Sequence, residues 1–100
     1  MDFRKHKRKK ADLMISYAGE QIVGKGTVCD LSQAGCGVVT KDKVPVGSFL
    51  EAQIQYPGDA EALFVEVAVV RYSISNRFGL DFLKLAPQEE QKLKRLIRAL

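Results

Sequence analysis

Six segments with the composition of β-strands follow one another along this chain, at spacings of about ten residues. Each is rich in apolar or β-branched side chains, and most end at residues that favour turns. The clearest segment is 49–56, where apolar and polar residues alternate as in a half-buried strand. The predicted strands cover residues 12–17, 21–31, 35–40, 49–56, 63–72 and 77–83. Six short strands with regular turn signals predict a small antiparallel β-barrel.

The last fifteen residues change to the period of a helix. Leu93, Leu96, Ile97 and Leu100 recur at the spacing that places them on one face. Pro87 fits the first helical position, and acidic residues precede basic ones along the segment, which complements the helix dipole. We therefore expect a C-terminal α-helix that covers one open end of the barrel. A helix that binds a partner is the alternative.

A chain of 100 residues is typical of one domain. We expect an all-β domain with one helix: a basic arm over residues 1–10, a six-stranded barrel over 11–85 and the helix over 86–100. No apolar run approaches the roughly 20 residues that a membrane-spanning helix needs. The N-terminal segment also lacks the apolar region of a secretory signal. The expected location is therefore the cytoplasm.

The positive charge is concentrated at the N-terminus. The first ten residues hold six of the 16 lysines and arginines and one of the 12 acidic residues, so the remaining ninety are nearly neutral. A basic arm of this kind attracts anions such as nucleic acid, acidic lipid or a nucleotide. Its low apolar content predicts that it is mobile without a ligand.

Residues that commonly serve metal binding and catalysis are few. Cys29, Cys36 and the single histidine, His6, do not have the spacing of a zinc site or a disulfide framework. We expect the cysteines to be small packing residues at neighbouring strand ends, with a redox pair as the alternative. The sequence holds no Gly-Lys-Ser/Thr phosphate loop and no plausible catalytic triad. It therefore predicts a binding protein that is not an enzyme and has no metal or cofactor.

Two short motifs carry residues suited to a guanine nucleotide. Arg4 and Arg8, in an Arg-x-x-x-Arg motif, supply planar donors that match phosphate or the acceptor edge of guanine. Asp30 opens an Asp-x-Ser-x-x-Gly motif with Ser32 and Gly35, and its carboxylate can accept from the N–H edge of that base. Alone, the first motif could be a solvated charge run and the second a turn. Their combination in one small β-rich domain favours a pocket for an anionic guanine nucleotide.

Together with a late Gly-x-x-Phe segment, Gly79 to Phe82, these motifs resemble the PilZ domain family, bacterial receptors for cyclic di-GMP. The resemblance covers essentially the whole chain. The family fold, a six-stranded barrel with a C-terminal helix, agrees with the strand and helix pattern described above.

The resemblance implies a role for each motif residue. Arg4 and Arg8 are expected to grip guanines and phosphates, and Asp30 to accept from guanine N–H groups. Ser32 is expected to add a hydroxyl contact, and Gly35 to leave room for the base or ribose. Further contacts are expected among Phe3, Lys5, Lys7, Lys9, Cys36, Gly37, Arg71, Tyr72 and Gly79.

Two of these positions suggest finer detail by the same resemblance. Tyr72 and Arg71 lie near the place from which some family members add a stacking or polar contact. Phe3 stands where members that hold two intercalated ligands more often have a basic residue. The resemblance therefore favours one ligand per domain.

We expect binding to order the basic arm over the barrel. Fixing a residue costs about 1–2 kcal/mol, which charge-assisted hydrogen bonds of about 1.5–3 kcal/mol each can offset. Because no second domain is expected, the output would be a new surface for a downstream protein. The alternative function is a small basic nucleic-acid-binding barrel, although the aromatic residues are scattered and form no regular platform for stacking bases.

Overall fold

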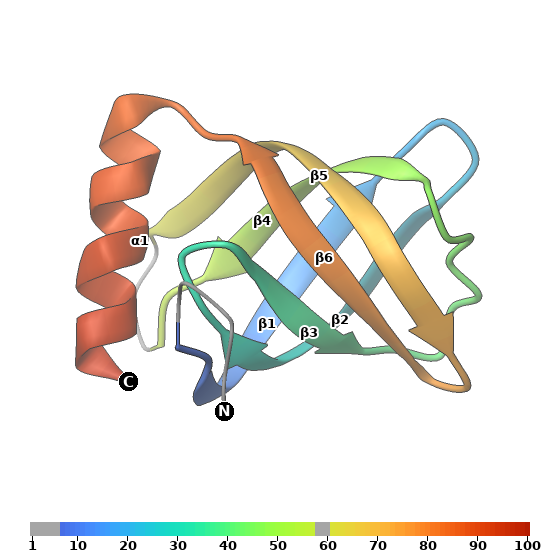
Figure 1. The fold of residues 1–100 in the computed structure, drawn as a ribbon, viewed down its shortest axis with the longest axis horizontal. Helices are drawn as coiled ribbons and strands as arrows, with labels where there is room; N and C mark the ends of the chain where they lie inside the picture. Colours follow the sequence, from blue (N-terminus) through green and yellow to red (C-terminus); the bar gives the residue numbers. More distant parts are fainter. Residues whose placement is uncertain (1–6, 58–60) are drawn as a thin grey trace.

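The computed structural model describes residues 7–57 and 61–100, in which six strands close into a barrel followed by one helix (Figure 1). Neighbouring strands are antiparallel, in the order β1-β2-β3-β6-β5-β4 around the barrel. The elements are β1 (Lys9–Ala18), β2 (Val23–Leu31), β3 (Gly35–Val39), β4 (Phe49–Gln55), β5 (Ala62–Ile74), β6 (Arg77–Lys84) and α1 (Pro87–Ala99). The predicted six-stranded antiparallel barrel with a C-terminal helix is confirmed.

Two strands are longer than their residue patterns predict. β1 begins at Lys9, within the range expected for the basic arm, because Lys9 and Lys10 pair with Leu31 and Asp30 of β2. β5 continues to Ile74, since its last residues pair with the start of β6 in a tight hairpin. Pairing with the next strand extends both elements, and the composition of the extended residues alone does not predict that pairing.

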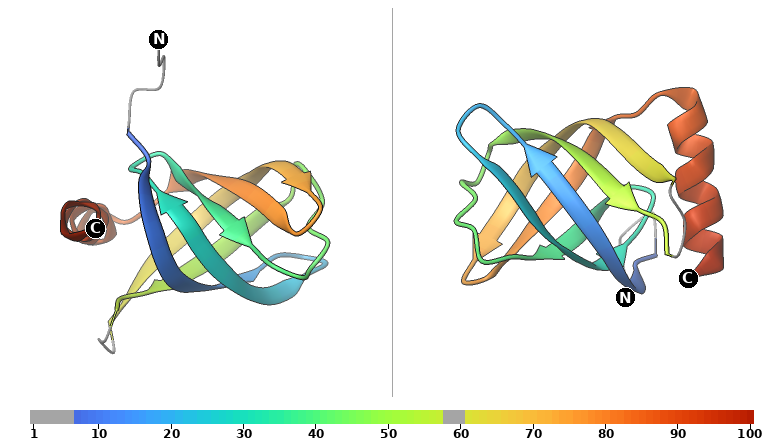
Figure 2. Two further views of the ribbon diagram at one scale, coloured as in Figure 1. Left: turned by 90° about the horizontal axis from the view of Figure 1, so that it is seen from below. Right: turned by 180° about the vertical axis from the view of Figure 1, so that it is seen from behind.

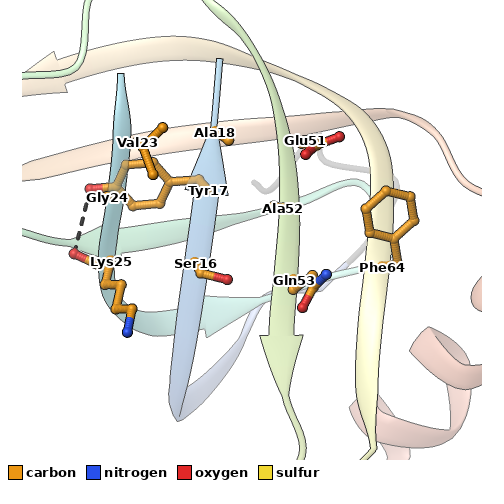
Figure 3. A pocket seen from close by; sticks show the side chains of 10 residues that line it. All are labelled: Ser16, Tyr17, Ala18, Val23, Gly24, Lys25, Glu51, Ala52, Gln53 and Phe64. Atoms are coloured by element: carbon orange, nitrogen blue, oxygen red, sulfur yellow. Dashed lines mark hydrogen bonds between the residues drawn. The ribbon is translucent and has the colours of Figure 1, made fainter. Parts of the chain in front are cut away.

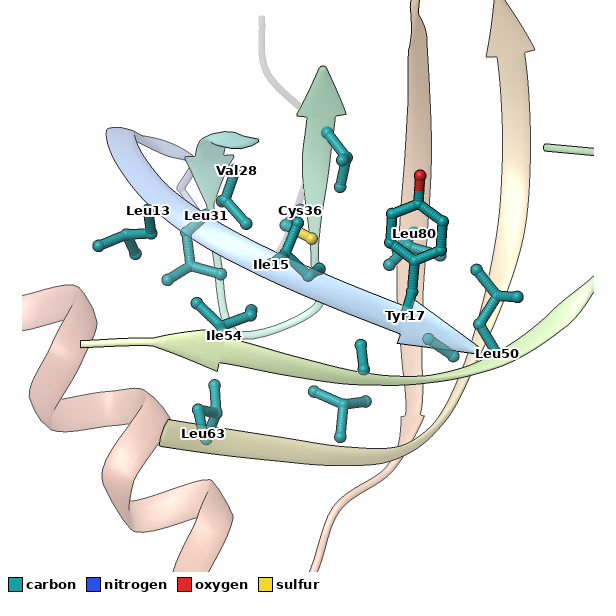
Figure 4. Close-up of a cluster of buried hydrophobic side chains, with 14 of the residues drawn as sticks. Leu13, Ile15, Tyr17, Val28, Leu31, Cys36, Leu50, Ile54, Leu63 and Leu80 are labelled. Atoms are coloured by element: carbon teal, nitrogen blue, oxygen red, sulfur yellow. The ribbon is translucent and has the colours of Figure 1, made fainter. Parts of the chain in front are cut away.

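Alternate residues of the strands point inward and fill the barrel (Figure 4). In β4, Leu50, Ala52 and Ile54 are almost fully buried while their neighbours are exposed. Tyr17 meets Phe78 edge to face, with ring centroids 5.2 Å apart and planes at 82°. Because side chains occupy the interior, ligands have access to the outer wall and the ends.

Helix α1 packs beside one end of the barrel (Figure 2). Leu93 and Leu96 are buried and join the core. The side chain of Glu89 accepts a 2.7 Å hydrogen bond from the backbone N–H of Phe64 in β5. These contacts agree with the predicted role of the helix as a cover. Within the described part of the chain, no helix has the length and apolar character needed to cross a membrane.

Candidate ligand-binding site

Strand pairing brings the second motif into one row with the late glycine motif. Across β1, β2, β3, β6 and β5, the paired residues are Lys10, Asp30, Gly37, Gly79 and Tyr72. The inner residues of β3 and β6 alternate with these glycines, so the row lies on the outer wall. Asp30 and Tyr72 therefore stand on either side of a two-residue glycine floor, formed by Gly37 and Gly79.

The glycine floor is required by the approach of the side chains that flank it. A Cβ atom at Gly79 would lie 2.2 Å from the Tyr72 ring, and one at Gly37 would lie 2.8 Å from Oδ2 of Asp30. A side chain at either position would displace the ring or the carboxylate. Glycine therefore lets the Tyr72 ring and the Asp30 carboxylate pack directly against the backbone, and both glycines are buried.

Asp30 is the centre of the polar contacts at this site. Its Oδ1 accepts from Nη1 of Arg8 at 2.5 Å and from the backbone N–H of Gly37 at 3.1 Å. Its Oδ2 accepts from Nη2 of Arg77 at 3.0 Å and contacts the thiol of Cys29 at 3.9 Å. The Asp30 side chain is only 20% exposed. The site thus pairs a mostly buried carboxylate, which can accept N–H donors, with two guanidinium groups that can bind an anion.

The rest of the Asp-x-Ser-x-x-Gly motif forms the turn between β2 and β3. Ser32 is 1% exposed, and its Oγ accepts from the backbone N–H groups of Ala34 at 3.1 Å and Gly35 at 3.3 Å. A Cβ at Gly35 would lie 2.0 Å from the carbonyl oxygen of Leu80, so only glycine fits where the turn passes β6. Both residues shape the turn. A direct ligand contact from Ser32, and space for a base at Gly35, stay predictions.

The first motif is described only in part. Arg8 lies immediately before β1 and reaches Asp30, so the two motifs meet. Lys7 and Lys9 are exposed beside it. Phe3, Arg4 and Lys5 lie outside the described residues, and their predicted contacts stay predictions.

Three other predicted residues occupy different surroundings. Arg71 is exposed and pairs with Asp81 at 3.0 Å, while the neighbouring Tyr72 borders the glycine floor. Cys36 is fully buried, and burial raises the pKa of its thiol. Cys36 therefore belongs to the core, as expected for a packing residue, and its predicted ligand contact stays a prediction. Cys29 and Cys36 are both free thiols.

Sequence reasoning does not identify Arg77. It is the first residue of β6, and it lies 47 positions from Asp30 in the chain. A hydrogen bond with Tyr72 is the main influence on the pKa of Arg77, which is raised. The alternation of side chains along β6 could have identified Arg77 from the sequence. Arg77 precedes Gly79 by two residues, so both lie on the same face of β6.

A separate hollow of about 450 Å³ lies on the outer wall over β2, β1, β4 and β5 (Figure 3). Lys25, Ser16, Gln53 and Phe64 pair in one row across these strands. The small side chain of Ser16 leaves space between its longer neighbours. Lysine is the only basic side chain among the residues that line this hollow, so it lacks the paired guanidinium groups of the Asp30 site.

A second polar cluster lies towards the other end of β1. The hydroxyl of Tyr17 donates to Oδ2 of Asp42 at 2.6 Å and lies 2.8 Å from Oγ1 of Thr40. Thr40 in turn donates to the backbone carbonyl of Lys25 at 3.0 Å. Burial, assisted by the hydrogen bond to Asp42, raises the pKa of Tyr17 to about 12. This cluster joins β1 to the segment that follows β3.

Comparison with protein-family models matches the PilZ domain over residues 2–99. No curated protein matches the chain. Among solved structures, the Bacillus subtilis inhibitor of motility (MotI/DgrA) superposes with a TM-score of 0.78 and 24% identity, over 99% of this chain and 52% of that one. The PilZ domain of CeSA from a cellulose-synthesising bacterium gives 0.75 and 21%, over 93% and 96% of the two chains. YcgR from Escherichia coli, in complex with c-di-GMP, gives 0.77 and 19%, over 97% and 45%.

The chain spans about half the length of MotI/DgrA and YcgR, and it matches nearly all of the CeSA domain. At these identities the superpositions show a shared fold. The family model adds a match along nearly the entire sequence. By this match, the chain belongs to the PilZ domain family.

Proposed function

We propose that this chain is a bacterial, cytoplasmic receptor for cyclic di-GMP, and a binding module rather than an enzyme. The observation that carries the proposal is the convergence of Arg8 and Asp30, one from each motif, beside the glycine floor. The similarity to YcgR, which was solved in complex with c-di-GMP, supports it.

The chemistry of guanine suits this site. The base presents N–H donors at its Watson–Crick edge, which the carboxylate of Asp30 accepts, and adjacent acceptors O6 and N7, which match an arginine. Phosphates take the remaining guanidinium and lysine donors. Tyr72, which packs over Gly79 and is partly exposed, offers a ring face for stacking. The proposed ligand residues are Arg4, Arg8, Asp30, Ser32 and Gly35.

Signalling in this proposal depends on the basic arm. Residues 1–10 hold six lysines and arginines, whose charge attracts a dianionic ligand, so binding orders the arm over the barrel. The ordered arm and the ligand then form a surface that a downstream protein recognises.

Titration calorimetry with cyclic di-GMP at low salt tests the receptor function. We expect the wild-type chain to bind one ligand, and Arg8→Ala to abolish measurable binding while leaving the melting temperature of the free protein nearly unchanged. Arg98→Ala, on the exposed face of α1, is the matched control and should bind as wild type does. A wild-type chain with its N-terminus intact that fails to bind would refute the proposal, and two ligands per chain would refute the stoichiometry.

Asp30→Ala should weaken binding by roughly 1–3 kcal/mol, the usual contribution of one base-edge contact. The same titration over a range of salt concentrations distinguishes the nucleic-acid alternative. Binding of a polyanion weakens by a log–log slope near −0.7 to −0.9 per phosphate contact, whereas a dianionic ligand should lose far less. Linear RNA that binds more tightly than cyclic di-GMP would favour the alternative.

A further inference from the structure

We propose that Arg77 holds Asp30 paired and oriented for guanine when Arg8 leaves that carboxylate to bind the ligand. Arg77 would then be a positioning residue that determines base specificity. This inference rests on the proposed function and concerns a residue outside the two motifs.

The first step is that Asp30 has no acceptor position to spare. A carboxylate has about four lone-pair sites on its two oxygens. Four donors already occupy them: the guanidinium groups of Arg8 and Arg77, the backbone N–H of Gly37 and the thiol of Cys29. Guanine offers two N–H donors, at N1 and N2, so two of the present donors must leave before the base can pair fully with Asp30. The thiol of Cys29, at 3.9 Å, is the weakest of the four, and one of the other three must leave with it.

The second step identifies the donor that is free to leave. The N–H of Gly37 belongs to the backbone of β3, which pairs with strands on both sides. Arg77 is also anchored, because its backbone pairs with Val39 and its side chain is hydrogen bonded to Tyr72. Arg8 precedes the first residue of β1 and has no strand pairing. It is therefore the cation that can move from Asp30 to a phosphate or to the acceptor edge of the base.

The third step concerns the partners that Asp30 keeps after Arg8 has moved to the ligand. The Asp30 side chain is only 20% exposed, and a largely buried carboxylate without a cation is strongly unfavourable. Arg77 binds Oδ2, the oxygen opposite the one that Arg8 occupies. It can therefore remain paired with Asp30 while Oδ1 becomes available to guanine. Arg77 makes the exchange possible without contacting the ligand.

Base specificity follows from this arrangement. Hypoxanthine keeps O6, N7 and N1–H but lacks the N2 amino group, so cyclic di-IMP preserves the phosphates and loses one donor to Asp30. A residue that acts through Asp30 should therefore affect cyclic di-GMP more than cyclic di-IMP. A residue that contacts a phosphate should affect both equally.

The experiment is a double-mutant cycle measured by titration calorimetry with both dinucleotides. The variants are wild type, Arg77→Ala, Asp30→Ala and the double variant, with Arg98→Ala on the exposed face of α1 as the control. We expect Arg77→Ala to weaken cyclic di-GMP binding about tenfold and to narrow the preference over cyclic di-IMP. In the Asp30→Ala background the same change should cost less than twofold, because the residue through which Arg77 acts is gone. Arg98→Ala should bind within twofold of wild type.

Arg77→Lys keeps a cation near Oδ2 and guards against a folding defect in Arg77→Ala. It should recover binding to within about threefold of wild type, since a single ammonium donor can replace the one guanidinium contact. The inference would be overturned if Arg77→Ala bound cyclic di-GMP with wild-type affinity, or if it lost the same affinity with and without Asp30. Either result would leave the receptor function intact. Failure of the wild-type chain to bind either dinucleotide would instead count against the proposed function.

Discussion

Two carboxylates near opposite ends of β1, those of Asp30 and Asp42, are held by different kinds of partner. Asp30 accepts from two arginine side chains, one of which lies outside any strand. Asp42 accepts from the hydroxyl of Tyr17, which is 2% exposed and also contacts Thr40. The first cluster is held by two arginine side chains at the outer wall, and the second by the hydroxyl groups of Tyr17 and Thr40, both of which are buried.

This difference teaches which polar cluster can respond to a ligand. An arginine can exchange one anion for another, because its charge is satisfied in both states. When a buried hydroxyl moves away, its former partners are left buried without a hydrogen bond. The protein then loses the full desolvation free energy of those groups. The Asp30 cluster therefore suits binding, and the Tyr17 cluster suits stability.

Tyr17→Phe should give the largest change in stability. Removing the hydroxyl takes one hydrogen-bond partner from each of Asp42 and Thr40, although Thr40 still donates to the Lys25 carbonyl, so we expect the free energy of unfolding to fall by about 1–3 kcal/mol. Urea unfolding measures this change, and calorimetry with cyclic di-GMP should show affinity within twofold of wild type. Lost binding with unchanged stability would reverse the assignment of the two clusters.

The same tyrosine predicts a dependence on alkaline pH. Its pKa is raised from 10.0 to about 12, so the folded state favours the protonated phenol. The stabilisation that comes from this raised pKa is fully present below pH 10 and is lost as the pH rises towards 12. Wild type and Tyr17→Phe should therefore become closer in unfolding free energy across this range.

Glu89→Gln should change the stability less than Tyr17→Phe does, and it tests the contribution of a carboxylate that is held by hydrogen bonds. Burial alone would raise its pKa, but hydrogen bonds from the N–H of Phe64 and from Lys92 outweigh burial and lower it below 4.5. Glu89→Gln keeps an acceptor and loses the charge, so we expect a loss of about 0.5–1.5 kcal/mol at neutral pH. Because the folded pKa is depressed, this difference is present above pH 4.5 and should shrink as the pH falls through the folded pKa. A difference that grows in acid would contradict this account.

Arg71→Ala should have the smallest effect. The ion pair between Arg71 and Asp81 has side chains 67% and 40% exposed, so solvent screens it. We expect less than about 0.5 kcal/mol in unfolding free energy. A loss of more than 1 kcal/mol would show that exposed cations on this wall also stabilise the barrel, and would weaken the contrast between the two clusters.

The fold was largely predictable because its signals are local. Alternation in 49–56 and the helical spacing of the last residues depend only on neighbours in the chain. The early start of β1 at Lys9 was not predictable in this way. Lysine has a low propensity for β-strands, so Lys9 and Lys10 extend β1 only because β2 pairs with them.

The site was predictable in its parts but not in its arrangement. Arg8 and Asp30 each stand in a recognisable motif, yet their contact depends on the register between β1 and β2. Arg77 belongs to neither motif, and strand pairing alone brings it close to Asp30. Ser32 fits both a turn and a ligand contact from sequence, and its hydrogen bonds to the Ala34 and Gly35 N–H groups show that it forms the turn.

The row from Lys10 to Tyr72 draws one residue from each of five strands, so it exists only after these strands have paired. The unfolded chain does not present this row, so a molecule that recognises the row binds the folded state alone. By mass action, a ligand at one hundred times its dissociation constant adds about 2.7 kcal/mol to the folded state. Under the proposed receptor function, rising levels of cyclic di-GMP would also protect the protein from proteolysis, and falling levels would shorten its lifetime.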